Sequence, residues 1–241
     1  MPANPRAVNT VVIPAYNEEK GLGVLLEKLF QVVGDTYEVI VVDDGSTDGT
    51  PEVARQFACR LIRHEVNQGK GVSIQTGIQE SRGEVVVWVD ADDTYPVAVI
   101  PQMVANLRQS YDLVSAWRRE GRQHIPWLNR LGNAIFTWAV SAFYGLKTRD
   151  ACTGLRGARR EHLARMALTG KRFTIDCEIA LKAGRMRLHN MDIPISYGER
   201  LGRPKLSGLR DGAQIALTLL RHVFWQAAKT RMVADDHERH A

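Results

Sequence analysis

Short runs of apolar, mostly β-branched residues alternate with longer segments of helical character in the first half of the chain. The short runs predict strands at residues 10–13, 37–42, 60–63 and 85–89. The segments between them predict helices that begin near residues 22, 50, 71 and 97. Three successive strand–helix alternations are typical of a mostly parallel sheet with right-handed crossovers, flanked by helices, and therefore predict an α/β fold.

The pattern is less regular in the second half. It predicts a strand over 112–116, a basic loop over 118–122, a turn-rich loop over 150–157, a helix over 173–183, a strand over 186–197 and a helix over 212–232. Pro194 predicts that the strand over 186–197 lies at an edge of the sheet. The helix predicted over 125–146 is apolar around much of its circumference, so it either packs in the core or lies in a membrane interface.

Polar residues follow the predicted strands, and the carboxyl ends of parallel strands meet at one edge, where α/β sheets bind ligands. We therefore expect a cluster of Tyr16, Glu18, Asp43, Asp44, Lys70, Asp90 and Asp92. Asp90 and Asp92 are two residues apart in extended chain, so their carboxylates can meet at one point and bind Mg²⁺ or Mn²⁺. A solvated acidic turn at Asp90 and an Asx-type turn at Asp43 are the structural alternatives.

Composition narrows the class of protein. The chain has 241 residues and a net charge of +5, which favours phosphate-bearing or anionic partners. Cys59, Cys152 and Cys177 show no metal-binding spacing and cannot all pair, so a reduced, cytosolic compartment is expected. No segment reaches the roughly 18 consecutive apolar residues of a membrane-spanning helix. Any membrane association is therefore expected to be peripheral.

Four ordered motifs carry a family resemblance. They are residues 12–19 (VIPAYNEE), 42–50 (VDDGSTDGT), 67–71 (NQGKG) and 90–92 (DAD). In order and spacing they resemble glycosyltransferase family 2, and within it the dolichyl- or polyprenyl-phosphate mannosyltransferase and glucosyltransferase branch. The resemblance implies a GT-A catalytic domain over residues 1–210, followed by a C-terminal amphipathic helix and polar tail over 211–241.

The resemblance also implies an inverting transfer from a nucleotide-sugar donor, GDP-mannose or UDP-glucose, with the metal held by Asp90 and Asp92. Together with Lys70, the donor-binding residues would be Pro14, Ala15, Tyr16, Glu18, Asp43, Asp44, Ala91, Arg200 and Lys205. Arg118, assisted by Arg130 and Asn133, would bind the phosphate of a polyprenyl acceptor. The sequence departs from the branch at residues 116–117, at Pro204 and at Asp93, which could add a metal contact or act as a base.

A polyprenyl phosphate is already an anionic nucleophile, so it needs no dedicated general base, whereas a hydroxyl acceptor does. The sequence thus predicts a peripheral enzyme on the cytoplasmic face of a membrane, with no nucleic-acid partner and with room for a membrane-anchoring subunit. The alternatives are a family 2 enzyme with a hydroxyl acceptor, using Asp93, Asp176 or Glu178 as base, and a non-catalytic nucleotide-sugar binding module. A signalling receiver leaves Asp90 and Asp92 unexplained, and a dinucleotide oxidoreductase lacks the Gly-x-Gly-x-x-Gly motif.

Overall fold

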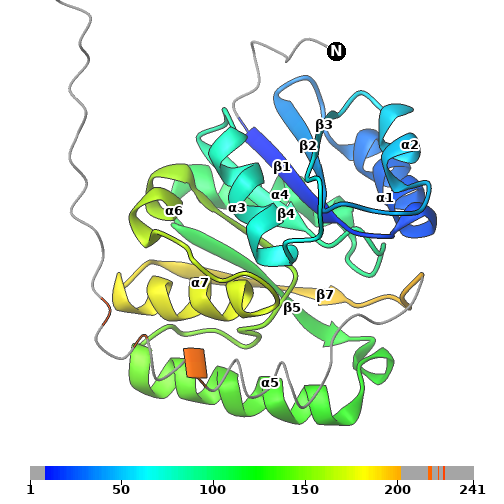
Figure 1. Cartoon of the computed structure of the whole chain (residues 1–241). Helices are drawn as coiled ribbons and strands as arrows, with labels where there is room; N and C mark the ends of the chain where they lie inside the picture. Colours follow the sequence, from blue (N-terminus) through cyan, green and yellow to red (C-terminus); the bar gives the residue numbers. More distant parts are fainter. Residues whose placement is uncertain (1–8, 202–216, 219–221, 223–224, 226–241) are drawn as a thin grey trace, which may run out of the picture.

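A single sheet organises the part of the chain that the computed structural model describes, which is residues 9–201 with 217, 218, 222 and 225. Its strands are β1 (Asn9–Ala15), β2 (Tyr37–Asp43), β3 (Arg60–Arg63), β4 (Val85–Val89), β5 (Leu113–Glu120), β6 (Leu155–Arg159) and β7 (Asn190–Ser196). They lie in the order β3-β2-β1-β4-β6-β5-β7 (Figure 1). Only β6 among them runs antiparallel to its neighbours. The predicted α/β fold with a mostly parallel sheet is confirmed.

Helices cover both faces of this sheet. They are α1 (Glu19–Val32), α2 (Thr50–Arg55), α3 (Lys70–Glu80), α4 (Ile100–Gln109), α5 (Trp127–Ala139), α6 (Arg160–Met166) and α7 (Thr174–Arg185). Short 3₁₀ turns lie at Val97–Val99 and Arg122–His124, and a π-helical turn, η3 (Val140–Tyr144), continues α5. Successive strand residues point to opposite faces, so Val11 and Ile13 pack in one core with α1 and α4, while Val12 packs in a second core with α3 and α7.

The order in which the chain adds strands to the sheet reverses at β1. From β1 it continues to β2 and then β3 on one side, and β4 lies on the other side of β1. The carboxyl ends of β1 and β4 therefore flank the point at which the strand order reverses, which is where open α/β sheets bind ligands. The motifs at residues 12–19 and 90–92 lie at this point.

Several predictions for the second half were wrong in detail. Residues 118–120 of the predicted basic loop belong to β5, because β7 pairs with that strand as far as Glu120. Residues 155–157 of the predicted turn-rich loop belong to β6, and α6 was missed. The helix predicted over 125–146 is shorter, with α5 ending at Ala139 and η3 at Tyr144. The edge position predicted from Pro194 is confirmed, since β7 ends the sheet.

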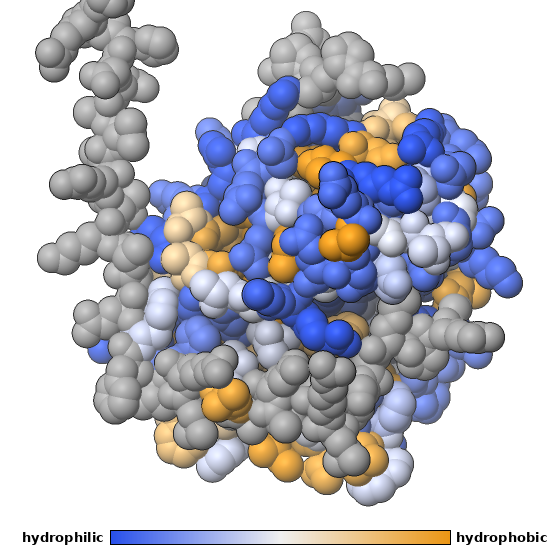
Figure 2. Space-filling model, viewed as in Figure 1, coloured by the Kyte–Doolittle hydropathy of each residue, from blue (hydrophilic) through white to orange (hydrophobic). Residues whose placement is uncertain are grey.

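Helix α5 lies at one end of the molecule, outside the two helical layers (Figure 1). Its C-terminal part and η3 bury Phe136, Val140 and Tyr144 in the second core. Its outer face is exposed and apolar, as the hydropathy view shows along the lower edge (Figure 2), with Trp127, Leu128, Leu131, Ile135, Trp138 and Phe143 all more than half exposed. Core packing thus explains only one side of this helix. No helix within the described residues is long and apolar enough to cross a membrane.

The C-terminal segment is described only in part. His222 and Trp225 contact α7, where His222 Nε2 lies 3.4 Å from Glu178 and the Trp225 ring lies 4.9 Å from the Lys182 ammonium. The predicted helix over 212–232 and the polar tail fall almost entirely outside the described residues. The domain boundary near residue 210 therefore stays a prediction.

Candidate active site

Two cavities open at the carboxyl ends of the strands and meet at a shared wall. The first, of about 440 Å³, lies beside β1 and the start of α3, and the second, of about 350 Å³, lies between the sheet and α5. Both are lined by the same five residues, Lys70, Asp90, Asp92, Phe173 and Arg200. A ligand in one cavity can therefore meet a ligand in the other at the Asp90–Asp92 pair.

Asp90 and Asp92 reach this wall because β4 ends at Val89. Asp90 pairs with Lys70 at 2.7 Å, and Asp92 pairs with Arg200 at 2.7 Å. The hydroxyl of Thr94 donates to Asp92 Oδ1 at 2.6 Å and fixes that carboxylate. Gly154 packs directly against Asp90, since a Cβ at residue 154 would lie 2.0 Å from Asp90 Oδ2. The two carboxylates are thus held in defined positions by their neighbours.

Two basic side chains balance the acids of the shared wall. Lys70 bridges Asp90 and Asp176, at 2.7 Å from each, and Arg200 bridges Asp92 and Glu18. Burial raises the pKa of the Asp90 carboxyl to about 6; the Lys70 ammonium opposes this shift, and the nearby Asp92 carboxylate adds to it. An additional positive charge beside Asp90 would therefore stabilise its ionised form.

The donor set at this wall fits a hard divalent cation. Within the described residues, no group of three or more His, Cys, Asp or Glu side chains forms a complete metal site. Mg²⁺ in phosphate sites needs only one or two protein carboxylates, because phosphate and water oxygens complete its coordination. Asp90 and Asp92 supply two, and Asp176 Oδ1 is buried there without a hydrogen-bond partner in the described part of the chain. Carboxylate oxygens of this kind suit Mg²⁺ or Mn²⁺.

Most of the residues predicted to bind the donor line the larger cavity. They are Pro14, Ala15, Tyr16, Glu18, Asp44, Lys70, Asp90, Ala91, Asp92 and Arg200. Asp44 is fixed by the backbone N–H groups of Gln68 and Gly69, at 2.9 and 2.7 Å, and by the His64 ring at 2.8 Å. Gly69 has a φ of +97°, which lets the loop turn back toward that carboxylate.

Two predicted residues are not part of this cluster. Asp43 is fully buried and lines neither cavity; it accepts a hydrogen bond from the Ser46 N–H and pairs with Arg63. Its geometry is that of the Asx-type turn considered as an alternative. Asp93 also lines neither cavity and pairs with Lys28 on α1 at 2.5 Å. Lys205 lies outside the described residues, as do Arg203 and Pro204.

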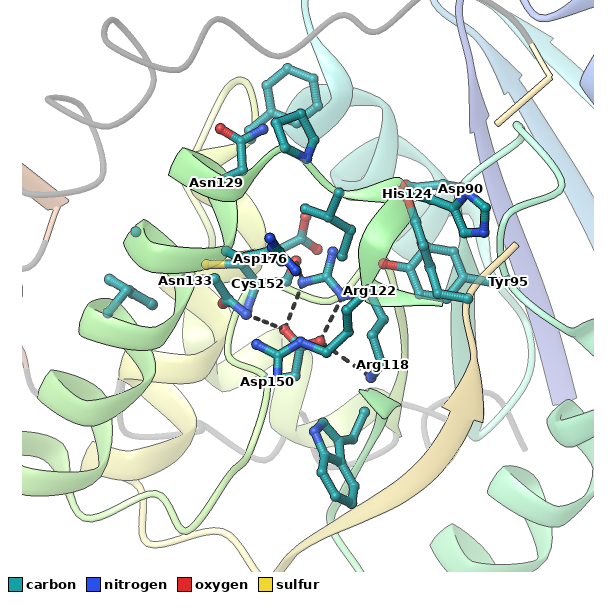
Figure 3. A pocket seen from close by; sticks show the side chains of 18 of the residues that line it. Asp90, Tyr95, Arg118, Arg122, His124, Asn129, Asn133, Asp150, Cys152 and Asp176 are labelled. Carbon is teal, nitrogen blue, oxygen red and sulfur yellow. Dashed lines mark hydrogen bonds and ion pairs between the residues drawn. The ribbon is translucent and has the colours of Figure 1, made fainter. Parts of the chain in front are cut away.

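The predicted acceptor residues line the smaller cavity, where two of them contact a carboxylate that sequence reasoning missed. Arg118 binds Asp150 with two hydrogen bonds, of 2.6 and 2.7 Å, and Asn133 donates to the same carboxylate at 2.9 Å (Figure 3). Burial alone would raise the pKa of Asp150, but the Arg118 guanidinium outweighs it and lowers the pKa. Arg130 lines the same cavity, as do the further basic residues Arg122, His124 and Arg149.

Asp150 stands in a loop whose position depends on a buried arginine. Arg156 on β6 is fully buried and donates to Ser115 Oγ and to the carbonyls of Ala151 and Asp176, at 2.8–3.0 Å. These bonds hold the loop before β6 against α7, so that Asp150 faces Arg118. The only local signal for Asp150 was an acid in a turn-rich segment between two helices.

Glu178, an alternative base in the sequence reading, lies in a buried network apart from the two cavities. It pairs with Lys182 at 2.5 Å and accepts hydrogen bonds from the N–H groups of Thr169 and Gly170. Burial alone would raise its pKa, but the hydrogen bonds from His222 and Lys182 outweigh it and lower the pKa to about 2. Asp176, the other alternative, does line the second cavity.

Glu178→Gln is expected to lower the free energy of unfolding at pH 7 by about 3 kcal/mol, which is the free-energy equivalent of the lowered pKa. Because the folded-state pKa lies below the ordinary value of 4.5, the wild-type contribution is present above pH 4.5 and is lost as the pH falls toward 2. Urea unfolding at pH 7 and pH 3 should show a smaller pH dependence in the variant. The exposed Glu52→Gln serves as control. Normal stability with lost turnover would instead make Glu178 a base.

Comparisons with known proteins point to one family. Residues 10–166 match the family model described as glycosyl transferase family 2. A dolichyl-phosphate hexose transferase of Haloferax volcanii is 36% identical over 213 residues, covering 88% of this chain and 92% of the relative. An undecaprenyl-phosphate 4-deoxy-4-formamido-L-arabinose transferase of Pseudomonas aeruginosa is 32% identical over 211 residues, covering 83% of this chain and 61% of the relative.

Solved structures share the fold. Glucosyl-3-phosphoglycerate synthase from Mycobacterium tuberculosis, in complex with Mn²⁺, UDP and phosphoglyceric acid, superposes with a TM-score of 0.71 at 22% identity, covering 91% of this chain and 79% of that one. At this identity the likeness shows the GT-A fold alone. The family model covers well over half of the chain and includes Lys70, Asp90 and Asp92 of the shared wall. The chain is therefore a glycosyltransferase and belongs to glycosyltransferase family 2.

Proposed function

We propose that this enzyme transfers a hexose from a nucleotide sugar to a polyprenyl phosphate at a membrane surface. The observation that carries the proposal is the smaller cavity, which joins the Asp90–Asp92 pair at one end to the base of an exposed apolar helix at the other. Its lining combines arginines with apolar side chains from α5, including Leu128 and Phe136. An anionic headgroup on an apolar chain matches this combination. The two relatives with lipid-phosphate names support the same acceptor class.

The larger cavity is the proposed donor site. Lys70 and Arg200 would bind the diphosphate, and Asp44 and the end of β1, which line the same cavity, would border the nucleoside. A divalent cation held by Asp90 and Asp92 would offset the repulsion between these acids and the diphosphate and would stabilise the charge that develops on the departing group. GDP-mannose and UDP-glucose are the two donors proposed.

The proposed acceptor phosphate binds Arg118, with Arg130 and Asn133 beside it. Asp150 holds Arg118 in place from the other side by two hydrogen bonds. The carboxylates that line the second cavity are ion-paired, Asp90 and Asp176 with Lys70, Asp92 with Arg200 and Asp150 with Arg118. A phosphate nucleophile is already ionised, so none of these carboxylates needs to remove a proton from it. Positioning and charge stabilisation are then sufficient for the transfer. In-line attack from the acceptor side, opposite the diphosphate, inverts the anomeric carbon.

Helix α5 is the proposed membrane contact of a peripheral enzyme on the cytoplasmic face. Its outer face carries two tryptophans, Trp127 and Trp138; the helix also supplies Arg130, and the neighbouring segments supply Arg122 and Arg149. Aromatic residues with flanking cations are typical of helices that lie in the interface plane. Such a helix brings the second cavity to the level of lipid headgroups. A separate anchoring subunit would add to this contact without replacing it.

The decisive experiment offers the purified protein and Mn²⁺ or Mg²⁺ two labelled donors, GDP-mannose and UDP-glucose, each with a short-chain polyprenyl phosphate. We expect label from one donor to be extracted with the lipid. The matched acceptor is the corresponding polyprenol, which has a hydroxyl in place of the phosphate and should stay unlabelled. Transfer to the polyprenol or to a soluble glycan, with the phosphate inert, would favour the hydroxyl-acceptor enzyme. Binding of donor without transfer to any acceptor would favour the non-catalytic module.

The double variant Leu131→Gln with Ile135→Gln is expected to weaken binding to lipid vesicles by about 2 kcal/mol, or roughly 30-fold, because two exposed apolar side chains can no longer enter the interface. Both are more than half exposed, so the fold should be unaffected. Vesicle co-sedimentation measures the binding. Val32→Gln with Val66→Gln, two exposed apolar residues on other elements, is the matched control. Equal loss in both double variants would argue against a specific role of α5.

A further inference from the structure

A third cavity, of about 640 Å³, lies beside η3 at the C-terminal end of α7 and, among the described residues, shares no lining residue with the two cavities of the active site. Among the described residues, its lining contains four basic residues and no acidic one. The basic residues are Lys147, Arg185, Arg187 and His189. All four are exposed, and the first three carry a positive charge. The proposed transfer reaction uses none of them.

The segments that carry these basic residues pack against one another. Helix α7 lies directly on η3, since a Cβ at Gly184 would lie 2.5 Å from the Tyr144 carbonyl oxygen. The Arg185 guanidinium stacks over the Tyr144 ring, with 4.7 Å from its carbon to the ring centroid. The amide of Asn190 donates to the Lys147 carbonyl at 3.0 Å and so ties the loop after η3 to β7. The cations therefore come from three segments that are packed together.

Two acids on neighbouring described segments already have partners. Asp192 accepts hydrogen bonds from the Arg149 N–H and the Thr148 hydroxyl, at 2.5 and 3.2 Å. Asp112 pairs with His162 at 3.1 Å and accepts a hydrogen bond from the backbone N–H of His189 at 3.0 Å. Neither acid lines the third cavity. The described lining of the cavity is thus positively charged, which favours an anionic ligand.

The position of the third cavity beside the apolar face of α5 indicates which class of anion it would bind. Phe143 lines the cavity, is 65% exposed and lies edge-on to Trp138 of α5, with 5.6 Å between the ring centroids. The exposed apolar face of α5 therefore runs up to the cavity. Apolar side chains beside clustered cations match a bilayer in which anionic headgroups lie above the acyl chains.

We propose that the third cavity binds the phosphate of an anionic phospholipid and anchors the C-terminal end of α5 to the membrane. This site is separate from the one for the acceptor phosphate, and the proposal rests on the proposed membrane contact of α5. It gives the enzyme two points of contact with the bilayer, one at each end of the helix. The enzyme should then prefer membranes rich in acidic phospholipid.

The test measures binding of the full chain to phosphatidylcholine vesicles with and without phosphatidylglycerol, for wild type and for Lys147→Gln with Arg187→Gln. Each cation at an anionic surface contributes about 1 kcal/mol, so the double variant should bind the anionic vesicles about 30-fold more weakly and the neutral vesicles equally well. The control is Lys20→Gln with Arg55→Gln, which removes the same charge from α1 and α2, away from α5 (Figure 1). Charges farther than a Debye length from the surface contribute little.

The outcomes separate this proposal from the proposed function. An unchanged preference for anionic vesicles in the Lys147–Arg187 variant, with vesicle binding still sensitive to Leu131 and Ile135, overturns the headgroup site alone. Equal losses in the test and control variants overturn it too, since net charge then explains the preference. Soluble glycerol phosphate is added as a competitor; if it occupies the cavity without displacing the vesicles, the ligand is a free phosphate and the headgroup site is wrong. Transfer to a short-chain acceptor in the absence of vesicles should be unchanged in the variant.

Discussion

Asp92→Asn is expected to lower kcat about 1000-fold, equivalent to roughly 4 kcal/mol of transition-state stabilisation. Asparagine keeps the shape of the side chain and can still accept the hydrogen bond from Thr94. It lacks the charge that would hold a divalent cation against the diphosphate and that pairs with Arg200. Initial rates at saturating donor and acceptor, measured over a titration of Mn²⁺, give this loss. Near-normal rates at any Mn²⁺ concentration would contradict the metal assignment.

Asp93→Asn is the matched variant, because it makes the same change one residue away. Asp93 pairs with Lys28 on α1 and lines neither cavity of the active site. We expect its kcat to stay within a few-fold of wild type. A loss as large as that of Asp92→Asn would instead give Asp93 the role of a base or metal ligand and would favour a hydroxyl acceptor.

Arg118→Gln is expected to raise KM for polyprenyl phosphate about 100-fold and to leave KM for the nucleotide sugar unchanged. The guanidinium lines the proposed acceptor cavity and would form a charge-assisted hydrogen bond with the lipid phosphate, worth up to about 3 kcal/mol. Steady-state kinetics with each substrate varied in turn separates the two constants. A rise in the donor KM alone would indicate that Arg118 contacts the nucleotide sugar and not the acceptor.

Removing Arg118 also leaves Asp150 as a buried carboxylate without its ion pair, which typically costs about 3–5 kcal/mol of stability. The double variant Arg118→Gln with Asp150→Asn removes that charge and serves as the control. Thermal unfolding should show stability recovering in the double variant, while KM for the acceptor stays high. If acceptor KM recovers together with stability, Arg118 acts only through folding.

Local patterns predicted the donor half of this enzyme well. There the strands are apolar runs, the helices between them have regular spacing, and the functional side chains follow directly after strands β1, β2 and β4. Parallel strands place such residues at one edge without further information. The positions of Tyr16, Asp44 and Asp90 in the larger cavity follow from this rule.

The acceptor half depends on contacts between distant segments, so local patterns were less informative. Strand β6 was missed because it carries Arg156 and Gly157, which are unusual in a buried strand. Arg156 is tolerated because carbonyl groups and Ser115 accept its hydrogen bonds. Glycine is needed at position 157 because a Cβ there would lie only 2.8 Å from the Val87 side chain. Asp150 becomes recognisable only through Arg118, which is 32 residues away in the chain.

The bridges made by Lys70 and Arg200 have a consequence for the order in which substrates arrive. Both carboxylates of the shared wall already have a positive partner, at 2.7 Å in each case. A bare metal ion approaching Asp90 and Asp92 would have to displace these cations and leave them without a counter-charge. A metal ion that arrives on a nucleotide diphosphate brings new negative partners for Lys70 and Arg200 in the same event. We therefore expect the complex of metal ion and nucleotide sugar, and not a free metal ion, to be the entering substrate.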